Sequence, residues 1–293
     1  MRLTALLLLV SGCAGVAPLP PQALELNRSG AQALAEGDLE AADARLGLAL
    51  EYSPRFVEAL INLGLVECQR GNFTRARQLL QRARRLNPDV AQVHHALGLL
   101  SEREQRPDVA SDHYRESLRV DPGFSPARAN LGRLLFDARA FEQARVTFQK
   151  LIEAAPAEVE GYVGLAESLL QLKRAAEADA VVGRAERLFA GHAAVTVLAA
   201  RKALRRGQHA AAIAALLPLT ARRDDWAAVA FAWLATAELS RSRPHEAIGA
   251  AEQALALEPE HPVATLALAR ALDAVGDPRA VQWVERARLL AKR

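Results

Sequence analysis

The stretch Glu58–Pro88, EALINLGLVECQRGNFTRARQLLQRARRLNP, predicts two amphipathic helices joined by a tight turn. Apolar and small residues recur at helical spacing around Leu60 and Gly64, and a second apolar face begins at Ala76. The intervening RGN breaks the first helix, and Pro88 ends the second helix or opens the next one. Because one such pair cannot bury its apolar face alone, it must stack on neighbouring pairs.

The same pattern recurs with a period of 34 residues. Prolines stand at Pro54, Pro88, Pro122 and Pro156. Alanines keep this period, with a slip of one residue near the end, at Ala42, Ala76, Ala110, Ala144, Ala178, Ala212, Ala247 and Ala280. Twelve residues before the first seven of these alanines lie Gly30, Gly64, Gly98, Gly132, Ala166, Ala200 and Ala235. We expect each of these small residues to let its helix approach the alanine twelve residues later.

The periodic alanines and prolines resemble the tetratricopeptide repeat family. The NLG stretches at Leu63 and Leu131 add to this resemblance. So do the glycines at the turns, which are Gly37, Gly71, Gly207 and Gly276. The resemblance covers residues 23–293 and implies an all-α fold, a right-handed superhelical solenoid of about eight 34-residue helix–turn–helix repeats. The alternative, an irregular helical bundle, does not explain an alanine every 34 residues. Pro218 lies inside a predicted helix, so we expect a bend near residues 216–228, or a seam between two repeat arrays.

The start of the chain carries a different signal, LLLLVSGCAG at Leu6–Gly15. A positive residue, an uncharged apolar run and small residues before a cysteine resemble a bacterial lipoprotein signal. The resemblance implies that residues 1–12 are removed and that Cys13 is lipidated. It also implies that the protein faces the periplasm from the outer membrane, because position 14 is alanine and not the aspartate that retains such lipoproteins at the inner membrane. Residues 13–22 are proline-rich and predict a tether. An ordinary secretory signal, a membrane anchor and a buried first helix are the alternatives.

Composition and charge argue against a nucleic-acid partner, because the formal net charge is only +3 with abundant charges of both signs. The basic run Arg75–Pro88 lacks interleaved aromatic residues and predicts a solvated outer helix face. Contact with anionic lipid headgroups or an acidic partner, and nucleic-acid binding, are the alternatives for this run. Cys13 and Cys68 are the two cysteines, so a disulfide framework is not expected, and Cys68 is predicted to be an inert, partly buried thiol.

No catalytic pattern emerges from the sequence. It holds no glycine-rich phosphate loop, no Gly-x-Ser-x-Gly turn and no paired-cysteine zinc spacing. His94 and His95 are adjacent, and consecutive helical residues point about 100° apart, so they do not chelate a metal together. The sequence therefore predicts a non-enzymatic protein without a cofactor or a metal.

The first helix of each repeat is expected to line a concave binding surface. The family resemblance implies that certain positions of these helices face this groove. They include Asn27, Ile61, Leu65, His95, Leu99, Arg103, Arg133, Phe136, Arg201 and Arg205. An apolar strip edged by arginines favours a protein or peptide segment with apolar anchors and some acidic groups.

The resulting hypothesis is a lipid-anchored, non-enzymatic scaffold of the bacterial envelope that binds protein segments. By its architecture it resembles tetratricopeptide lipoproteins that assist assembly of outer-membrane complexes such as a pilus secretin. One alternative is an adaptor for polysaccharide export or for a cell-wall enzyme. Another is a cytoplasmic adaptor, if the leader is a buried helix.

Overall fold

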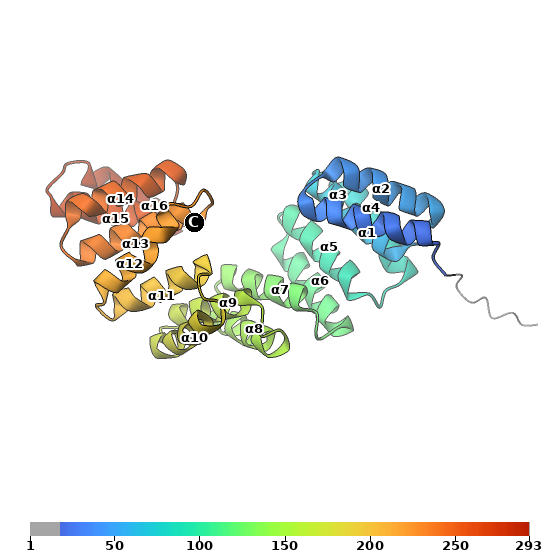
Figure 1. The fold of residues 1–293 in the computed structure, drawn as a ribbon, viewed down its shortest axis with the longest axis horizontal. Helices are drawn as coiled ribbons and strands as arrows, with labels where there is room; N and C mark the ends of the chain where they lie inside the picture. The colour runs from blue at the N-terminus through green and yellow to red at the C-terminus, as the bar shows by residue number, and fades with distance from the viewer. Residues whose placement is uncertain (1–17, 293) are drawn as a thin grey trace, which may run out of the picture. The chain divides into compact units, whose positions relative to one another are not determined.

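The computed structural model describes residues 18–292 (Figure 1). The predicted signal, the Cys13 lipidation site and most of the tether lie outside the described residues. Residues 18–292 form sixteen α-helices and no strand, which confirms the all-α repeat fold. The helices are α1 (Pro21–Glu36), α2 (Leu39–Tyr52), α3 (Val57–Gln69), α4 (Phe73–Leu86), α5 (Ala91–Arg103), α6 (Pro107–Val120), α7 (Ser125–Asp137), α8 (Phe141–Ala154), α9 (Val159–Gln171), α10 (Ala175–Leu188), α11 (Ala193–Arg205), α12 (His209–Thr220), α13 (Trp226–Ser240), α14 (Pro244–Leu257), α15 (Pro262–Ala274) and α16 (Ala280–Lys292).

The chain divides into two compact units, and the boundary falls between Phe124 and Ser125. The first unit holds α1 to α6 and the second holds α7 to α16. Within each unit, every odd-numbered helix pairs with the even-numbered helix that follows it, and the pairs stack in chain order (Figure 1). The 34-residue period of the sequence is therefore the period of a helix pair.

Each turn inside the eight described pairs places a residue in the left-handed region at the same repeat position. Four of these turns use Gly37, Gly71, Gly207 and Gly276, with φ between 71° and 82°. The other four use Gln105, Arg139, Lys173 and Ser242, with φ between 57° and 61°. The turns share a backbone hydrogen bond back to the end of the first helix. In the second pair, for example, the Asn72 backbone N–H donates to the Glu67 carbonyl at 2.8 Å, which satisfies a carbonyl at the helix end. The turn geometry thus repeats even where glycine does not.

The close approach inside each of the first four pairs uses a glycine, but against a different partner from the one expected. A Cβ added at Gly64 would lie 2.8 Å from the Leu80 side chain, and one added at Gly98 would lie 2.4 Å from the Tyr114 ring. Ala76, the expected partner of Gly64, contributes only a backbone oxygen at 3.5 Å. The large side chain sixteen residues after the glycine reaches across the pair and fills the space, which corrects the predicted alanine contact.

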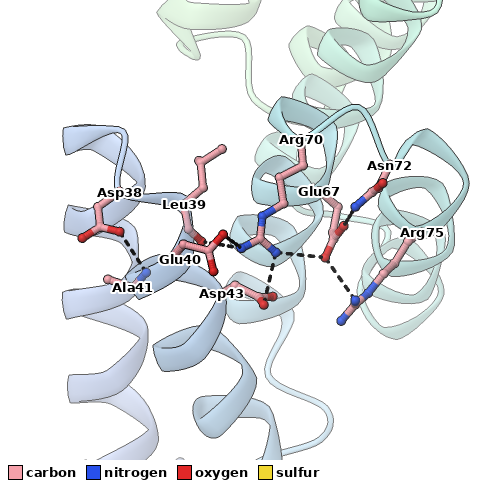
Figure 2. A network of polar contacts seen from close by, with 9 residues as sticks. All are labelled: Asp38, Leu39, Glu40, Ala41, Asp43, Glu67, Arg70, Asn72 and Arg75. Carbon is pink, nitrogen blue, oxygen red and sulfur yellow. Dashed lines mark hydrogen bonds and ion pairs between the residues drawn. The ribbon is translucent and has the colours of Figure 1, made fainter.

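A polar network joins the first two pairs around a buried carboxylate (Figure 2). Glu67 of α3 is fully buried, and its carboxylate accepts a hydrogen bond from the Asn72 side chain at 2.7 Å. Arg75 lies 3.3 Å from the same carboxylate. Arg70 follows α3 and forms an ion pair with Asp43 of α2 at 3.2 Å. Because a buried charge is costly when unpaired, this network ties the register of the second pair to the first.

Pro218 lies in the last turn of α12, where its ring removes a backbone donor. This helix has 12 residues, whereas α10 and α14 have 14 each. An irregular segment follows α12, up to the start of α13 at Trp226. The bend expected near residues 216–228 stays a prediction.

Candidate functional site

The predicted groove residues lie on the first helices of their pairs. Those of the first unit are Asn27 on α1, Ile61 and Leu65 on α3, and His95, Leu99 and Arg103 on α5. Those of the second unit are Arg133 and Phe136 on α7, and Arg201 and Arg205 on α11. The two sets belong to different compact units, so each is described on its own.

In the first unit these residues differ widely in exposure. Ile61 is only 5% exposed and belongs to the core together with Cys68. Leu65 and Leu99 are half-buried. The side chain of Asn27 accepts a hydrogen bond from Asn62 at 3.0 Å, which links α1 to α3. The predicted apolar strip is therefore partly core in this unit.

Cys68 is a buried free thiol whose pKa is raised by burial.

The two adjacent histidines of α5 have separate structural roles. His94 is buried, and its Nε2 lies 2.8 Å from the carbonyl oxygen of Pro88. The ring of His95 lies 5.6 Å from the Tyr114 ring and 5.4 Å from the Phe124 ring, between centroids. Burial lowers the pKa of His95 to about 4, and the nearby Glu102 carboxylate opposes the shift only partly. His95 is therefore neutral near pH 7 and offers an aromatic face.

Most arginines of the basic run make contacts within the first unit. Arg75 pairs with Glu67, Arg77 pairs with Glu104, and Arg82 donates to the carbonyl of Pro54. Arg84 and Arg85 of α4 are exposed. Arg75 and Arg82 are exposed as well, so the run forms a solvated helix face, as predicted, and some of its side chains also contact neighbouring turns.

The second unit holds a pocket of about 400 Å³ on the helices that sequence reasoning selected. Two predicted residues, Arg133 and Phe136, line it from α7. From α9 it takes Val159, Glu160, Val163, Gly164 and Glu167, and the other lining residues are Ala129, Asn130, Phe148, His192, Ala194 and Trp226. Its surface is mainly apolar, with charged groups among the lining residues.

The floor of this pocket is the ring of Phe148 from α8, clamped between two glycines. A Cβ at Gly132 would lie 2.7 Å from this ring, and a Cβ at Gly164 would lie 2.3 Å from it. The ring of Phe148 therefore fits only because neither position carries a Cβ, and Phe148 is only 5% exposed. Phe136 adds a second aromatic wall, held edge-on against Phe141 with centroids 5.3 Å apart. The apolar part of the pocket is pre-formed.

Beside this pocket, Arg201 and Arg205 line a second hollow of about 470 Å³ with Trp233. Arg201 forms an ion pair with Glu167 of α9, and its guanidinium lies 4.8 Å from the centre of the Trp233 ring. Arg205 pairs with Asp179 of α10 at 2.6 Å. Arg201 thus links three successive first helices, α9, α11 and α13, and Arg205 links α11 to α10, while both border the hollow.

Sequence reasoning missed the aromatic residues of α13. Trp226 lines the first pocket and Trp233 lines the second, although neither occupies a position singled out by the repeat pattern. A usable signal was present, because two of the three tryptophans of the chain lie within eight residues. Tryptophan is enriched in protein interfaces, since a large apolar ring carries a polar N–H.

No three His, Cys, Asp or Glu side chains of residues 18–292 are grouped so that they could hold a metal ion. No helix of the same range is long and apolar enough to cross a membrane.

Comparison with known proteins gives a consistent picture. Family models described as tetratricopeptide repeat match residues 33–100, 103–165 and 233–291. The type IV pilus assembly protein PilF of Pseudomonas aeruginosa is 31% identical over 136 residues, which cover 45% of this chain and 53% of PilF. The chain thus spans about half the length of this curated relative.

Solved structures agree on the fold. The crystal structure of the APC/C hetero-tetramer Cut9-Hcn1 matches with a TM-score of 0.67 and 17% identity, over 87% of this chain and 50% of that chain. A structure of pilF from Pseudomonas aeruginosa matches with a TM-score of 0.59 and 22% identity, over 71% of this chain and 94% of that chain. At these identities the likeness concerns the fold alone.

Proposed function

Because the chain belongs to the tetratricopeptide repeat family, as its periodic residues predicted, we propose that it is a non-enzymatic scaffold. It would bind a peptide segment of a partner protein in the pocket of about 400 Å³ whose floor is the ring of Phe148, called the Phe148 pocket below. Proteins of this family bind protein or peptide partners, and this one is related to PilF. The single observation that carries the proposal is a pocket of about 400 Å³ on α7 and α9 with a pre-formed aromatic floor.

The lining residues define the ligand chemistry. One or two apolar side chains of the ligand would rest on Phe148 and Phe136, where ring contact removes apolar area from water. Arg133 lines the same pocket and provides a cation for an acidic group of the ligand. Glu160 of α9 also lines the pocket and disfavours a second acidic group of the ligand. The ligand would be a short extended or helical segment with apolar anchors and one carboxylate.

A photo-crosslinking experiment in the native cell tests this proposal. A benzoyl-phenylalanine placed at Phe136 should form an adduct with one envelope protein. The matched control position is Leu188, which is 54% exposed on α10 of the same unit and does not line the pocket. Equal adducts from both positions, or none from position 136, would rule out the pocket as the binding surface. Mass spectrometry of the adduct would separate a pilus secretin from a polysaccharide-export or cell-wall enzyme partner.

We further propose that Cys13 is lipidated and anchors the scaffold to the periplasmic face of the outer membrane, where it assists assembly of a complex such as a pilus secretin. The leader pattern and the similarity to a type IV pilus assembly protein support this. Leu19 packs against the core of the first unit and α1 begins at Pro21. Only about six residues would then separate the lipid from the folded domain, roughly 20 Å if extended.

Metabolic labelling with radioactive palmitate tests the anchor. The wild-type chain should take up label and fractionate with the outer membrane, and the Cys13→Ser variant should lose the label. An unlabelled wild-type chain in the cytosolic fraction would support the cytoplasmic-adaptor alternative instead. Secretin multimers in a deletion strain report on the assembly role, because normal multimers there would exclude it.

A further inference from the structure

A groove between α15 and α16, the last helix pair described, forms a second apolar surface in the second unit. Its volume is about 610 Å³. Its apolar lining comes from Val263, Leu266 and Ala269 on α15 and from Val284, Ala287 and Ala291 on α16. Arg270, Asp273 and Arg288 contribute the charged groups among its lining residues.

The repeat architecture indicates what kind of group fits this groove. The helix α15 packs against both helices of the preceding pair, α13 and α14, as α9 packs against both α7 and α8 (Figure 1). Within residues 18–292, no following helix covers the groove of α15 and α16. Terminal repeats usually present a polar outer face, because that face meets water. Here Leu266 is 42% exposed and Val284 is 37% exposed, so this end keeps the apolar lining of an interior repeat.

The chain itself provides the chemistry of a fitting helix. On α15, Ala264 packs with Ala232 and Ala254, and Ala267 and Leu268 enter the next core cluster along the helix. The face of α15 that packs into the unit thus carries small residues and two leucines, Leu268 and Leu272, at helical spacing. Small residues let two helix backbones approach closely, which suits a groove lined by Ala269, Ala287 and Ala291.

The charges beside the groove set a second requirement. Arg288 forms an ion pair with Glu285 at 3.5 Å. Arg270 is exposed, and no acidic side chain of residues 18–292 forms an ion pair with it. A carboxylate on the incoming helix would meet this guanidinium at the edge of an apolar contact, where charge-assisted hydrogen bonds are strong.

We propose that the α15–α16 groove docks an amphipathic helix of a partner protein, with an alanine–leucine stripe facing Leu266 and Val284 and a carboxylate facing Arg270. The helix takes the place that the first helix of a following pair has in the interior of the unit. This surface is separate from the Phe148 pocket, so the scaffold offers two attachment points, and this inference does not depend on the peptide ligand.

A peptide with the sequence of residues 258–277 is the probe, because it contains α15 and carries four carboxylates and one arginine. Fluorescence anisotropy with the full chain should show saturable binding of the labelled peptide. A peptide with aspartate in place of both Ala267 and Leu268 should not bind, since it puts charge into the apolar contact.

Two variants of one helix provide the matched comparison. Val284→Arg places a charge in the groove and should weaken binding at least about tenfold. Val281→Arg, at a residue that is 77% exposed and outside the groove, should leave affinity within about twofold. Arg270→Glu should weaken binding, and a peptide with its four acidic residues changed to amides should bind less tightly. Circular dichroism should show equal helix content in the three variants, because all three sites are exposed.

Absence of binding to the wild-type chain overturns the proposal, as does equal weakening by Val284→Arg and Val281→Arg. Sedimentation equilibrium addresses the other occupant. A dimer that forms without peptide and that Val284→Arg dissociates would mean that a second copy of the chain fills the groove, which also overturns it. Crosslinking from Phe136 should be unchanged in Val284→Arg, so failure here and failure of the peptide pocket are distinguishable.

Discussion

At the scale of single residues, backbone strain is concentrated in the turns inside helix pairs. Gln105, Arg139, Lys173 and Ser242 adopt left-handed φ angles that Gly37, Gly71, Gly207 and Gly276 adopt at the equivalent positions. A side chain in this region crowds its own backbone, which costs of the order of 1 kcal/mol. The stacked pairs impose the conformation, because the same turn must recur for the next pair to fit.

Lys173→Gly should therefore raise the free energy of unfolding by about 0.5–1 kcal/mol, with the strain relief partly offset by the greater freedom of glycine in the unfolded chain. Lys173 is exposed, so little packing is lost. Urea denaturation followed by circular dichroism measures the change. Gly207→Ala is the reverse control and should lower stability by a similar amount, and a loss of stability in Lys173→Gly would contradict this explanation.

A second residue-scale prediction concerns His95, whose pKa burial lowers from 6.5 to about 4. Between these values the unfolded chain binds a proton that the folded chain does not, so stability rises with pH across this window. The contribution of His95 is fully present above about pH 6.5 and is lost as pH falls to about 4, by roughly 3 kcal/mol.

His95→Phe keeps the aromatic contacts with Tyr114 and Phe124 and removes this titration. Unfolding free energies measured at several pH values from 4 to 7.5 should show a shallower slope for His95→Phe than for the wild type. His113 and His261, whose pKa values burial also lowers, contribute to the slope that remains, as do Glu carboxylates whose pKa values are lowered by arginines. Identical slopes would mean that His95 titrates normally in the folded chain.

At the scale of elements, stability depends on how closely paired helices approach. Glycines at helix crossings receive a large side chain from the next helix, as Gly98 receives Tyr114 and Gly132 receives Phe148. Each fully buried large side chain contributes roughly 1.5–3 kcal/mol through the apolar area removed from water. The helix pair is thus held by shape complementarity, with the alanine-rich neighbours keeping the backbones near each other.

Gly164→Ala should lower the free energy of unfolding by about 1–2 kcal/mol, although alanine favours helix by about 1 kcal/mol. The new Cβ would lie 2.3 Å from the Phe148 ring, which must move. Gly249→Ala on α14 is the matched control, because a Cβ there meets no atom within 4 Å. That variant should be stabilised, as thermal unfolding can show, and a similar gain in Gly164→Ala would mean that the ring moves without cost.

At the scale of the whole molecule, each helix pair contacts only its chain neighbours within its own compact unit, so α5 with α6 ends the first unit and α7 with α8 begins the second. Such one-dimensional stacking makes stability a sum of pair and interface terms. The first pair, α1 and α2, and the last described pair, α15 and α16, have one neighbour each within residues 18–292.

Native-state hydrogen exchange should therefore show lower protection in the end pairs of each unit, α1 with α2, α5 with α6, α7 with α8 and α15 with α16, than in interior pairs such as α3 with α4 or α13 with α14. Addition of the 258–277 peptide should raise protection in α15 and α16 and leave α1 and α2 unchanged. Uniform protection along the chain would indicate global unfolding in place of stepwise opening.

By itself the sequence determined the helix pairs, because a 34-residue period of alanine, glycine and proline places the small and helix-breaking residues in every unit. It also directed attention to α7, where Arg133 and Phe136 line the pocket. Local spacing suffices for these features, since helix periodicity and turn chemistry are short-range.

Only the tertiary structure decided which side chain fills the space over each glycine, that Ile61 is core, that Arg201 is held by Glu167 and Trp233, and that Lys173 adopts a left-handed turn. These outcomes depend on contacts between helices far apart in the chain. Packing of that kind is set by the shapes and charges of several helices at once, so a repeat position alone does not determine it.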